Sequence, residues 1–339
     1  MLTLLTQSTT PIIGDLASIF GILMNGIYNF FGNTFGFFSL GFSIVVFTII
    51  TRLLMLPLAF RQQKSMKEMQ KIQPQIKKIQ DKYKNKKDHA SQQKQQAELQ
   101  ALYQEHNVSP LGGCLPLLIQ MPIIFSLYQV LRNIPAYITS VGDKYQLIVD
   151  NLNSVDGYAE KFAALNGSED TAAEVFKSAF QQVSNFDILI DNKVIDVMNK
   201  FQTETWDAFY AMFTDITANV QPIVVELYEI YDFFGINLAD KPNMMSIGVL
   251  IPVLNVVVQF FATRASMSAN KTAGGDSGGT AAQTNQTMMY TMPLISGFFA
   301  MQLPAGLGLY WLCGSLFQLG QTLFINRHLH INQDSVKKK

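Results

Sequence analysis

Charged residues are scarce in this chain and cysteine is nearly absent. Of its 339 residues 15% are charged and 48% are hydrophobic, whereas a soluble globular chain is about 25% charged. The composition therefore argues against a soluble enzyme and favours a membrane protein. A disulfide scaffold is disfavoured as well, because both cysteines, Cys114 and Cys313, lie in apolar stretches where they are predicted to act as small packing residues.

Five long stretches share a single charged residue, Arg52. The stretches are residues 38–60, 111–131, 243–263, 287–303 and 304–326. Each is 17 to 23 residues long, which matches the roughly 17 to 25 residues that a helix needs to cross a bilayer. Five prolines inside four of the stretches predict broken, adjustable helices: Pro57, Pro116, Pro122, Pro252 and Pro293. We therefore predict an all-α polytopic membrane protein with five transmembrane helices.

The segments between these stretches differ in charge. Residues 61–108 carry eleven basic and five acidic side chains, whereas residues 136–242 carry six lysines and seventeen acidic side chains. Because cytoplasmic loops accumulate Lys and Arg, the first segment is predicted to be cytoplasmic and the second to face outward. The N-terminus is then outside the membrane and the C-terminus inside. A sixth crossing near the start of the chain would invert this pattern, so an interfacial helix is favoured there.

The predicted organisation has ten parts. They are an extracytoplasmic N-terminal segment with an interfacial helix at 1–36, a first crossing at 37–60, a cytoplasmic helical hairpin at 61–109, a second crossing at 110–133, an extracytoplasmic, mostly helical domain at 134–242, a third crossing at 243–263, a cytoplasmic flexible loop at 264–286, a fourth crossing at 287–303, a fifth crossing at 304–326 and a basic cytoplasmic tail at 327–339.

Local signals add detail to four of these parts. Pro74 lies inside the apolar stripe of the first hairpin helix and should kink or split that helix. Ser109 and Pro110 form an N-cap and first-turn pair that predicts the start of the second crossing. In the extracytoplasmic domain, Thr171 to Glu174 is a capping box, but no phosphate loop or nucleophile elbow occurs. Residues 269–287 are rich in Gly, Ser and Thr, which predicts a flexible linker.

The hairpin has two interpretations. It is either a charged, solvated pair of helices without a partner, or a basic arm near anionic lipid and incoming polypeptide. In the second interpretation its docking residues are Lys67, Lys71, Lys77 and Lys78.

Arg52 is the residue that a bilayer tolerates least. A central arginine costs about 2.5 to 3.5 kcal/mol on insertion scales. No Asp or Glu occurs in any of the five stretches, so a salt bridge inside the bundle cannot offset this cost. The counter-charge must be water, backbone carbonyls, a loop carboxylate such as Glu68, lipid phosphate or a visiting ligand. A wet cavity open to the cytoplasm is the simplest explanation.

Polar side chains recur at helical spacing in three of the stretches. Taken singly, each set is explained by interhelical hydrogen bonds in a membrane. Taken with Arg52, they predict a shared hydrophilic groove. The residues are Thr48, Asn255, Gln259, Thr263, Trp311, Ser315, Gln318 and Thr322. All four histidines lie in predicted cytoplasmic segments, so we expect no intramembrane catalysis, no metal and no cofactor.

Three motifs resemble the YidC/Oxa/Alb family of membrane protein insertases. They are Thr-Arg-Leu-Leu-Met-Leu-Pro-Leu at 51–58, Asn-Val-Ser-Pro-Leu-Gly-Gly-Cys-Leu-Pro-Leu-Leu-Ile-Gln-Met-Pro at 107–122 and Pro-Ala-Gly-Leu-Gly-Leu-Tyr-Trp at 304–311. The resemblance implies that Arg52 is the family's intramembrane arginine, Thr48 its polar neighbour and Trp311 the aromatic residue of the last crossing. Where the family usually has Gln near the inner end of the third crossing, this chain has Thr263, with Gln259 one turn away.

The resemblance implies a protein that is not an enzyme and that passes hydrophobic segments of nascent proteins into the bilayer. The segments would enter through a groove open to the cytoplasm and to lipid, without ATP, alone or with the Sec translocon, in the bacterial cytoplasmic membrane. Expected partners are nascent membrane proteins, the ribosome, the Sec translocon and membrane lipids, with no direct contact to nucleic acid. The alternative is a secondary transporter of a small organic anion that uses Arg52, which is weakened by the lack of a repeated half and of intramembrane carboxylates.

Overall fold

The computed structural model of the chain describes residues 7–8, 10–36, 38–86, 88–108, 115–163, 165, 189–268 and 280–337. The chain forms two compact units. Unit 1 comprises residues 1–47, 122–248 and 303–307, and unit 2 comprises residues 48–121, 249–302 and 308–339. The predicted cap at Ser109, the Gly-Gly-Cys run of the second motif and the capping box at Thr171 lie outside the described residues.

The described residues are mostly helical, which confirms the all-α class. A two-stranded hairpin, β1 (Asp232–Phe233) and β2 (Ile236–Asn237), and a 3₁₀ turn at Ile247–Val249 separate α13 from α14. The helices are α1 Ile13–Phe35, α2 Leu40–Leu54, α3 Leu56–Lys71, α4 Gln73–Tyr83, α5 His89–Glu105, α6 Leu115–Arg132, α7 Ile134–Tyr137, α8 Thr139–Leu152, α9 Tyr158–Ala163, α11 Leu189–Met198, α12 Thr203–Met212, α13 Thr214–Tyr231, α14 Leu250–Ser268, α15 Thr280–Gln302 and α16 Ala305–Lys337.

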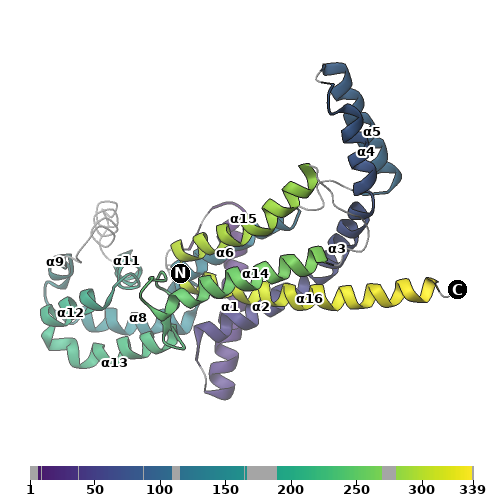
Figure 1. Cartoon of the computed structure of the whole chain (residues 1–339). Helices are drawn as coiled ribbons and strands as arrows, with labels where there is room; N and C mark the ends of the chain where they lie inside the picture. The colour runs from purple at the N-terminus through teal and green to yellow at the C-terminus, as the bar shows by residue number, and fades with distance from the viewer. Residues whose placement is uncertain are drawn as a thin grey trace. The chain divides into compact units, whose positions relative to one another are not determined.

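Unit 1 is built around α8, which packs against α7, α11 and α13. Figure 1 shows α8 beside α11 and α13. The facing sides of α8 and α13 are apolar at helical spacing and supply buried Ile148, Val149, Val220 and Val224. A cluster of aromatic rings from Phe162 to Phe213 closes the far end of this core. We call the predicted extracytoplasmic domain, residues 134–242, the outer block. It has a hydrophobic core of its own.

The stretch predicted as the first crossing is broken in the structure. Helix α2 ends at Leu54, α3 begins at Leu56, and the two are bent by 56°. Pro57 explains the break, because it has no N–H to donate to the carbonyl one turn earlier and its ring clashes there. Pro122 and Pro293 lie instead inside the continuous helices α6 and α15, so the broken helices predicted at these two positions are wrong.

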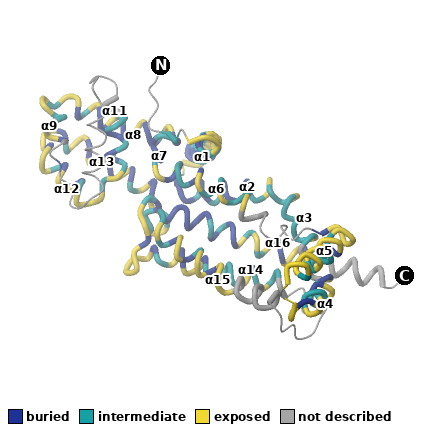
Figure 2. The backbone as a smooth tube through the Cα atoms, turned by 90° about the horizontal axis from the view of Figure 1, so that it is seen from above, coloured by how far each residue is buried: buried dark blue, intermediate teal, exposed yellow. Residues whose placement is uncertain are grey.

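Pro74 splits the predicted first helix of the hairpin, as its position indicated. Helix α3 ends at Lys71, and α4 begins with Pro74 in its first turn, where a missing N–H costs nothing. Helix α4 lies side by side with α5 in Figure 1. The pair shares a small core of Ile72, Ile76, Leu102 and Val108, while the rest of α5 is largely exposed (Figure 2).

In unit 2, α14 packs along α15. Gly297 permits this close contact, since a Cβ there would lie 2.3 Å from Cγ2 of Val256. The helices extend beyond the predicted ends: α15 begins at Thr280, inside the predicted linker, and α16 continues through the predicted tail to Lys337.

Within the described residues, one continuous helical stretch, Ile247–Ser266, is long and apolar enough to cross a membrane, with a mean hydropathy of 1.7. Helices α2 and α3 meet the same standard only if the bent pair counts as one span, and Leu118–Arg132 is apolar but shorter. Gln and Gly residues lower the hydropathy of α16. The count of five crossings therefore stays a prediction.

Candidate functional site

Arg52 lies on α2 with its guanidinium group against the backbone of α16. A Cβ built on Gly314 would lie 2.4 Å from Nη2 of Arg52 and 3.0 Å from its Nε, so only a glycine leaves room for the guanidinium group in this position. The side chain is half-buried. Its Nε is shielded from solvent and has no hydrogen-bond partner among the described residues. A buried donor without a partner favours an acceptor that visits the site, such as water or a polar segment.

Thr48 precedes Arg52 by one helical turn and is buried. The hydroxyl of Thr51 donates to the carbonyl oxygen of Thr48 at 2.9 Å. This bond satisfies a polar group inside the helix.

A network of hydrogen bonds joins α14, α15 and α16 next to Gly314. The hydroxyl of Ser315 donates to Oδ1 of Asn255 at 3.1 Å, and the Asn255 amide donates to the hydroxyl of Ser296 at 3.4 Å. Ser296 in turn donates to Oε1 of Gln259. The structure therefore brings together three of the residues predicted from the polar stripes, and adds Ser296, which the stripes did not indicate.

The remaining predicted groove residues are placed differently. Thr263 donates to the backbone carbonyl of Gln259 at 2.8 Å and so makes a local contact on its own helix. Trp311 is half-buried and Gln318 is exposed. Thr322 is buried and accepts a hydrogen bond from the amide of Gln63 at 2.9 Å.

Gln120 is a polar contact that sequence reasoning did not single out. Its amide donates to the hydroxyl of the buried Tyr310 at 2.9 Å, and so connects α6 to α16. The available signal was its position, since Gln120 is the one amide side chain in the apolar run from Leu115 to Phe125.

Three of the predicted docking lysines, Lys71, Lys77 and Lys78, can be placed on α3 and α4. Lys71 pairs with Glu68 at 2.7 Å and is exposed, Lys78 is exposed and Lys77 is half-buried. The side chain of Lys67 lies outside the described part. A further contact, missed in the sequence, holds α4 to α5: Lys82 and the hydroxyl of Tyr83 both donate to Glu98, which raises the pKa of Lys82 and lowers that of Glu98.

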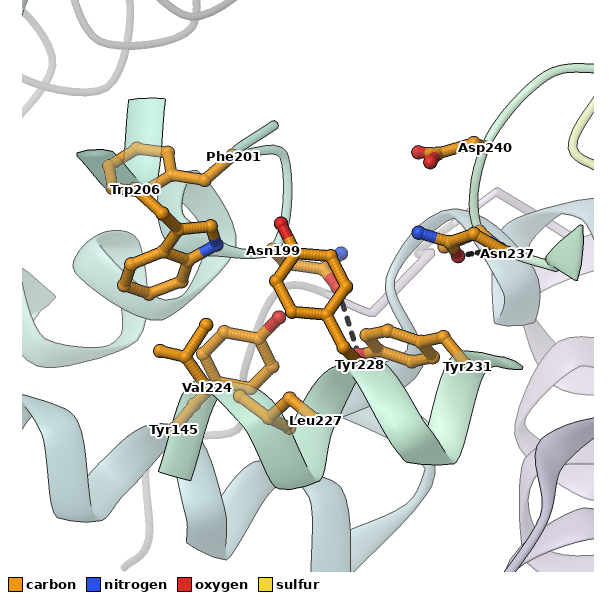
Figure 3. A pocket seen from close by; sticks show the side chains of 11 residues that line it. Tyr145, Asn199, Phe201, Trp206, Val224, Leu227, Tyr228, Tyr231, Asn237 and Asp240 are labelled. Carbon is orange, nitrogen blue, oxygen red and sulfur yellow. Dashed lines mark hydrogen bonds between the residues drawn. The ribbon is translucent and has the colours of Figure 1, made fainter. Parts of the chain in front are cut away.

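Unit 1 contains a separate pocket in the outer block. Figure 3 shows its lining side chains, with Trp206 on one side, Asp240 on the other and Tyr228 between them. It encloses about 360 Å³ of empty space, counting its open mouth. Burial raises the pKa of the Asp240 carboxyl group. The lining residues include no nucleophile paired with a base, and no group of His, Cys, Asp and Glu in the described ranges could hold a metal ion.

Comparison with known proteins assigns the chain to a family. The sequence profile of the family described as 60Kd inner membrane protein matches residues 30–333, most of the chain. The chain belongs to this family. It is the YidC/Oxa/Alb family of membrane protein insertases, so the resemblance seen in the three motifs is confirmed.

Individual insertases of this family match shorter parts of the chain. Membrane protein insertase YidC of Fusobacterium nucleatum is 44% identical over 123 residues, which are 36% of this chain and 55% of that protein. YidC of Clostridium perfringens is 42% identical over 35% of this chain and 49% of its own length. YidC 2 of Bacillus anthracis is 33% identical over 40% of this chain and 50% of its own length. The chain thus matches about half the length of these relatives.

Proposed function

We propose that this protein is a membrane protein insertase that passes hydrophobic segments of nascent proteins into the lipid bilayer. The relatives from Fusobacterium nucleatum and Clostridium perfringens are named as such insertases. The observation that carries the proposal is the setting of Arg52, whose Nε is buried without a partner in the described residues and whose guanidinium group lies against Gly314. The protein acts by binding and release and is not an enzyme.

In the proposed mechanism, a hydrophilic groove accepts the polar end of a new membrane segment and shortens its path through hydrocarbon. Arg52 attracts acidic residues of that end. The network of Ser315, Asn255, Ser296 and Gln259 offers hydrogen bonds to backbone groups that would otherwise be unsatisfied in lipid. Because the groove opens to lipid, the apolar part of the segment leaves sideways.

The membrane potential supplies the driving force. Each negative residue that crosses toward a positive exterior gains about 2.3 kcal/mol per 100 mV, so no ATP is needed. The protein lies in the bacterial cytoplasmic membrane with five crossings, its N-terminus outside and its C-terminus inside. Its α4/α5 pair projects into the cytoplasm, where Lys71, Lys77 and Lys78 meet nascent chains and anionic lipid. The ribosome and the Sec translocon are its proposed partners.

Purified protein in liposomes with an imposed membrane potential tests this proposal. Insertion of a single-spanning substrate is measured by protease protection, with the translocated tail varied from acidic to neutral. Arg52→Lys keeps the charge but shifts its position and should retain a reduced activity, whereas Arg52→Ala should lose nearly all activity, most strongly for acidic tails. An equal defect across all tails would remove electrostatic attraction from the mechanism. Uptake of small organic anions without any insertion would favour the transporter instead.

A further inference from the structure

Two turns that lie close together in the sequence of unit 1 expose large apolar side chains. Phe234, at the tip of the β1–β2 hairpin, is 84% exposed, and Met245, in the turn before α14, is 98% exposed. Met244 and Ile247 beside it are also exposed. We call these four residues the apolar rim. Leaving so much hydrocarbon in water is unfavourable, so the rim calls for an explanation.

The backbone at Phe234 makes the display more unusual. Phe234 and Gly235 form a two-residue hairpin turn with φ of 55° and 79°, both in the left-handed region. Turns of this kind favour Asn followed by Gly, and a bulky side chain at positive φ is strained. The turn is held by the Asp232 side chain, which accepts from the Gly235 amide at 3.2 Å. Strain of this kind persists where the displayed group has a use.

The second turn is fixed by its own hydrogen bonds. The Ser246 hydroxyl donates to the Asn243 carbonyl at 2.9 Å, and the Asn243 side chain accepts from the Met245 amide at 3.1 Å. These bonds satisfy the backbone locally and leave Met244 and Met245 free to project. Methionine is a flexible side chain that adapts to a fluid apolar environment.

Both turns are attached to the beginnings of apolar helices. Phe233 packs on Gly41 in the first turn of α2, where a Cβ would lie 2.2 Å from its Cδ2. The carbonyls of Leu238 and Asp240 accept from Gly306 and Ala305 in the first turn of α16, at 2.9 and 2.7 Å. Ile247 itself opens the stretch Ile247–Ser266 that is long enough to cross a membrane. The rim is therefore connected to the N-terminal ends of α2, α14 and α16, three of the proposed crossings.

We propose that the apolar rim inserts into the boundary between head groups and acyl chains of the membrane leaflet where α2, α14 and α16 begin. Lipid is favoured over a protein partner because the rim is continuous along the chain with a membrane-spanning helix and contains no charged residue. The rim anchors the base of the outer block at a fixed depth. This inference rests on the proposed crossing of these helices.

Depth-dependent fluorescence quenching tests the rim in the full chain. Cys114 and Cys313 are replaced by alanine, a single cysteine is placed at position 234 or 245, and an environment-sensitive fluorophore is attached in liposomes of neutral and anionic phospholipid. Val225, an exposed residue of α13, is the water-facing control, and Val257, exposed on α14, is the membrane control. Lipids with a nitroxide near the head group should quench positions 234 and 245 at least threefold more than position 225.

The controls separate the possible failures. If position 257 is not quenched by a nitroxide deep in the acyl chains, the proposed crossing is wrong. If position 257 is quenched but positions 234 and 245 behave like 225, the rim does not contact lipid and the inference is overturned. Disulfide crosslinks between two copies of the chain at position 234 would show that the rim binds a second copy instead of lipid. Phe234→Asn should raise the thermal stability in detergent by relieving the turn while lowering quenching at position 245, and unchanged quenching there would count against anchoring by Phe234.

Discussion

Replacing Gly314 by alanine tests the position of Arg52 without touching its charge. The new Cβ would lie 2.4 Å from Nη2 of Arg52, whereas carbon and nitrogen atoms in contact are about 3.5 Å apart. Because the guanidinium group is the end of a flexible side chain, it should move aside by about 1 Å and the helix should stay intact. The variant therefore keeps the positive charge of Arg52 but displaces it.

The size of the effect follows from Coulomb's law. A carboxylate 4 Å from the guanidinium group would be about 5 Å away after the shift. At an effective dielectric constant of about 20 the attraction falls by about 0.8 kcal/mol, which corresponds to about fourfold in rate or affinity. The free energy of unfolding should rise slightly, because alanine in a helix interior is favoured over glycine by roughly 0.5 to 1 kcal/mol.

The assay compares insertion of the acidic-tailed and neutral-tailed substrates in liposomes, together with thermal unfolding in detergent. Gly320 on the same helix is the matched control, because nothing lies within 4 Å of a Cβ built there. Gly314→Ala should lower insertion of the acidic substrate about fourfold at equal or higher stability, while Gly320→Ala should leave it unchanged. If Gly314→Ala inserts acidic tails as well as the wild type does, the argument from Arg52 geometry is refuted.

Three further predictions concern the rest of the chain. Desolvation and the nearby charge of Arg132 lower the pKa of Lys200 from 10.5 to about 8. The free energy of unfolding should therefore be highest above pH 10.5 and fall as the pH falls through 8. Thermal melts of the wild type and Lys200→Met should differ most below pH 8, and a constant difference would contradict the shift. Replacing residues 145–231 by a flexible linker should leave insertion largely intact, whereas removing residues 62–105 should abolish it. The reverse result in stably expressed variants would show that the outer block carries the insertion activity. A cysteine at Ser91 should react with an impermeant reagent only after permeabilisation and one at Ser154 in intact cells, and the opposite pattern would overturn the predicted orientation.

The sequence by itself determined the class of the protein and much of its local structure. Composition and apolar runs predicted a helical membrane protein, and the family was recognisable from three short motifs. Pro74 predicted a split helix because the loss of an N–H acts within one turn. The sequence also showed that Arg52 is unusual, because counting shows that the apolar stretches contain no carboxylate to pair with it. Each of these inferences depends on residues close together in the chain or on counts of residue types.

Contacts between distant segments were decided only by the tertiary structure. Periodicity placed Ser315 and Asn255 on polar stripes, but it did not pair them or bring Ser296 between Asn255 and Gln259. The spacing of polar residues shows which side of a helix is polar, but not which other helix that side contacts. Nor did it single out Gly314 as the surface against which Arg52 lies, since a glycine in an apolar run looks the same whether or not a side chain crosses it. Phe234 shows the same limit: its strain and exposure arise from a turn that only the folded backbone defines.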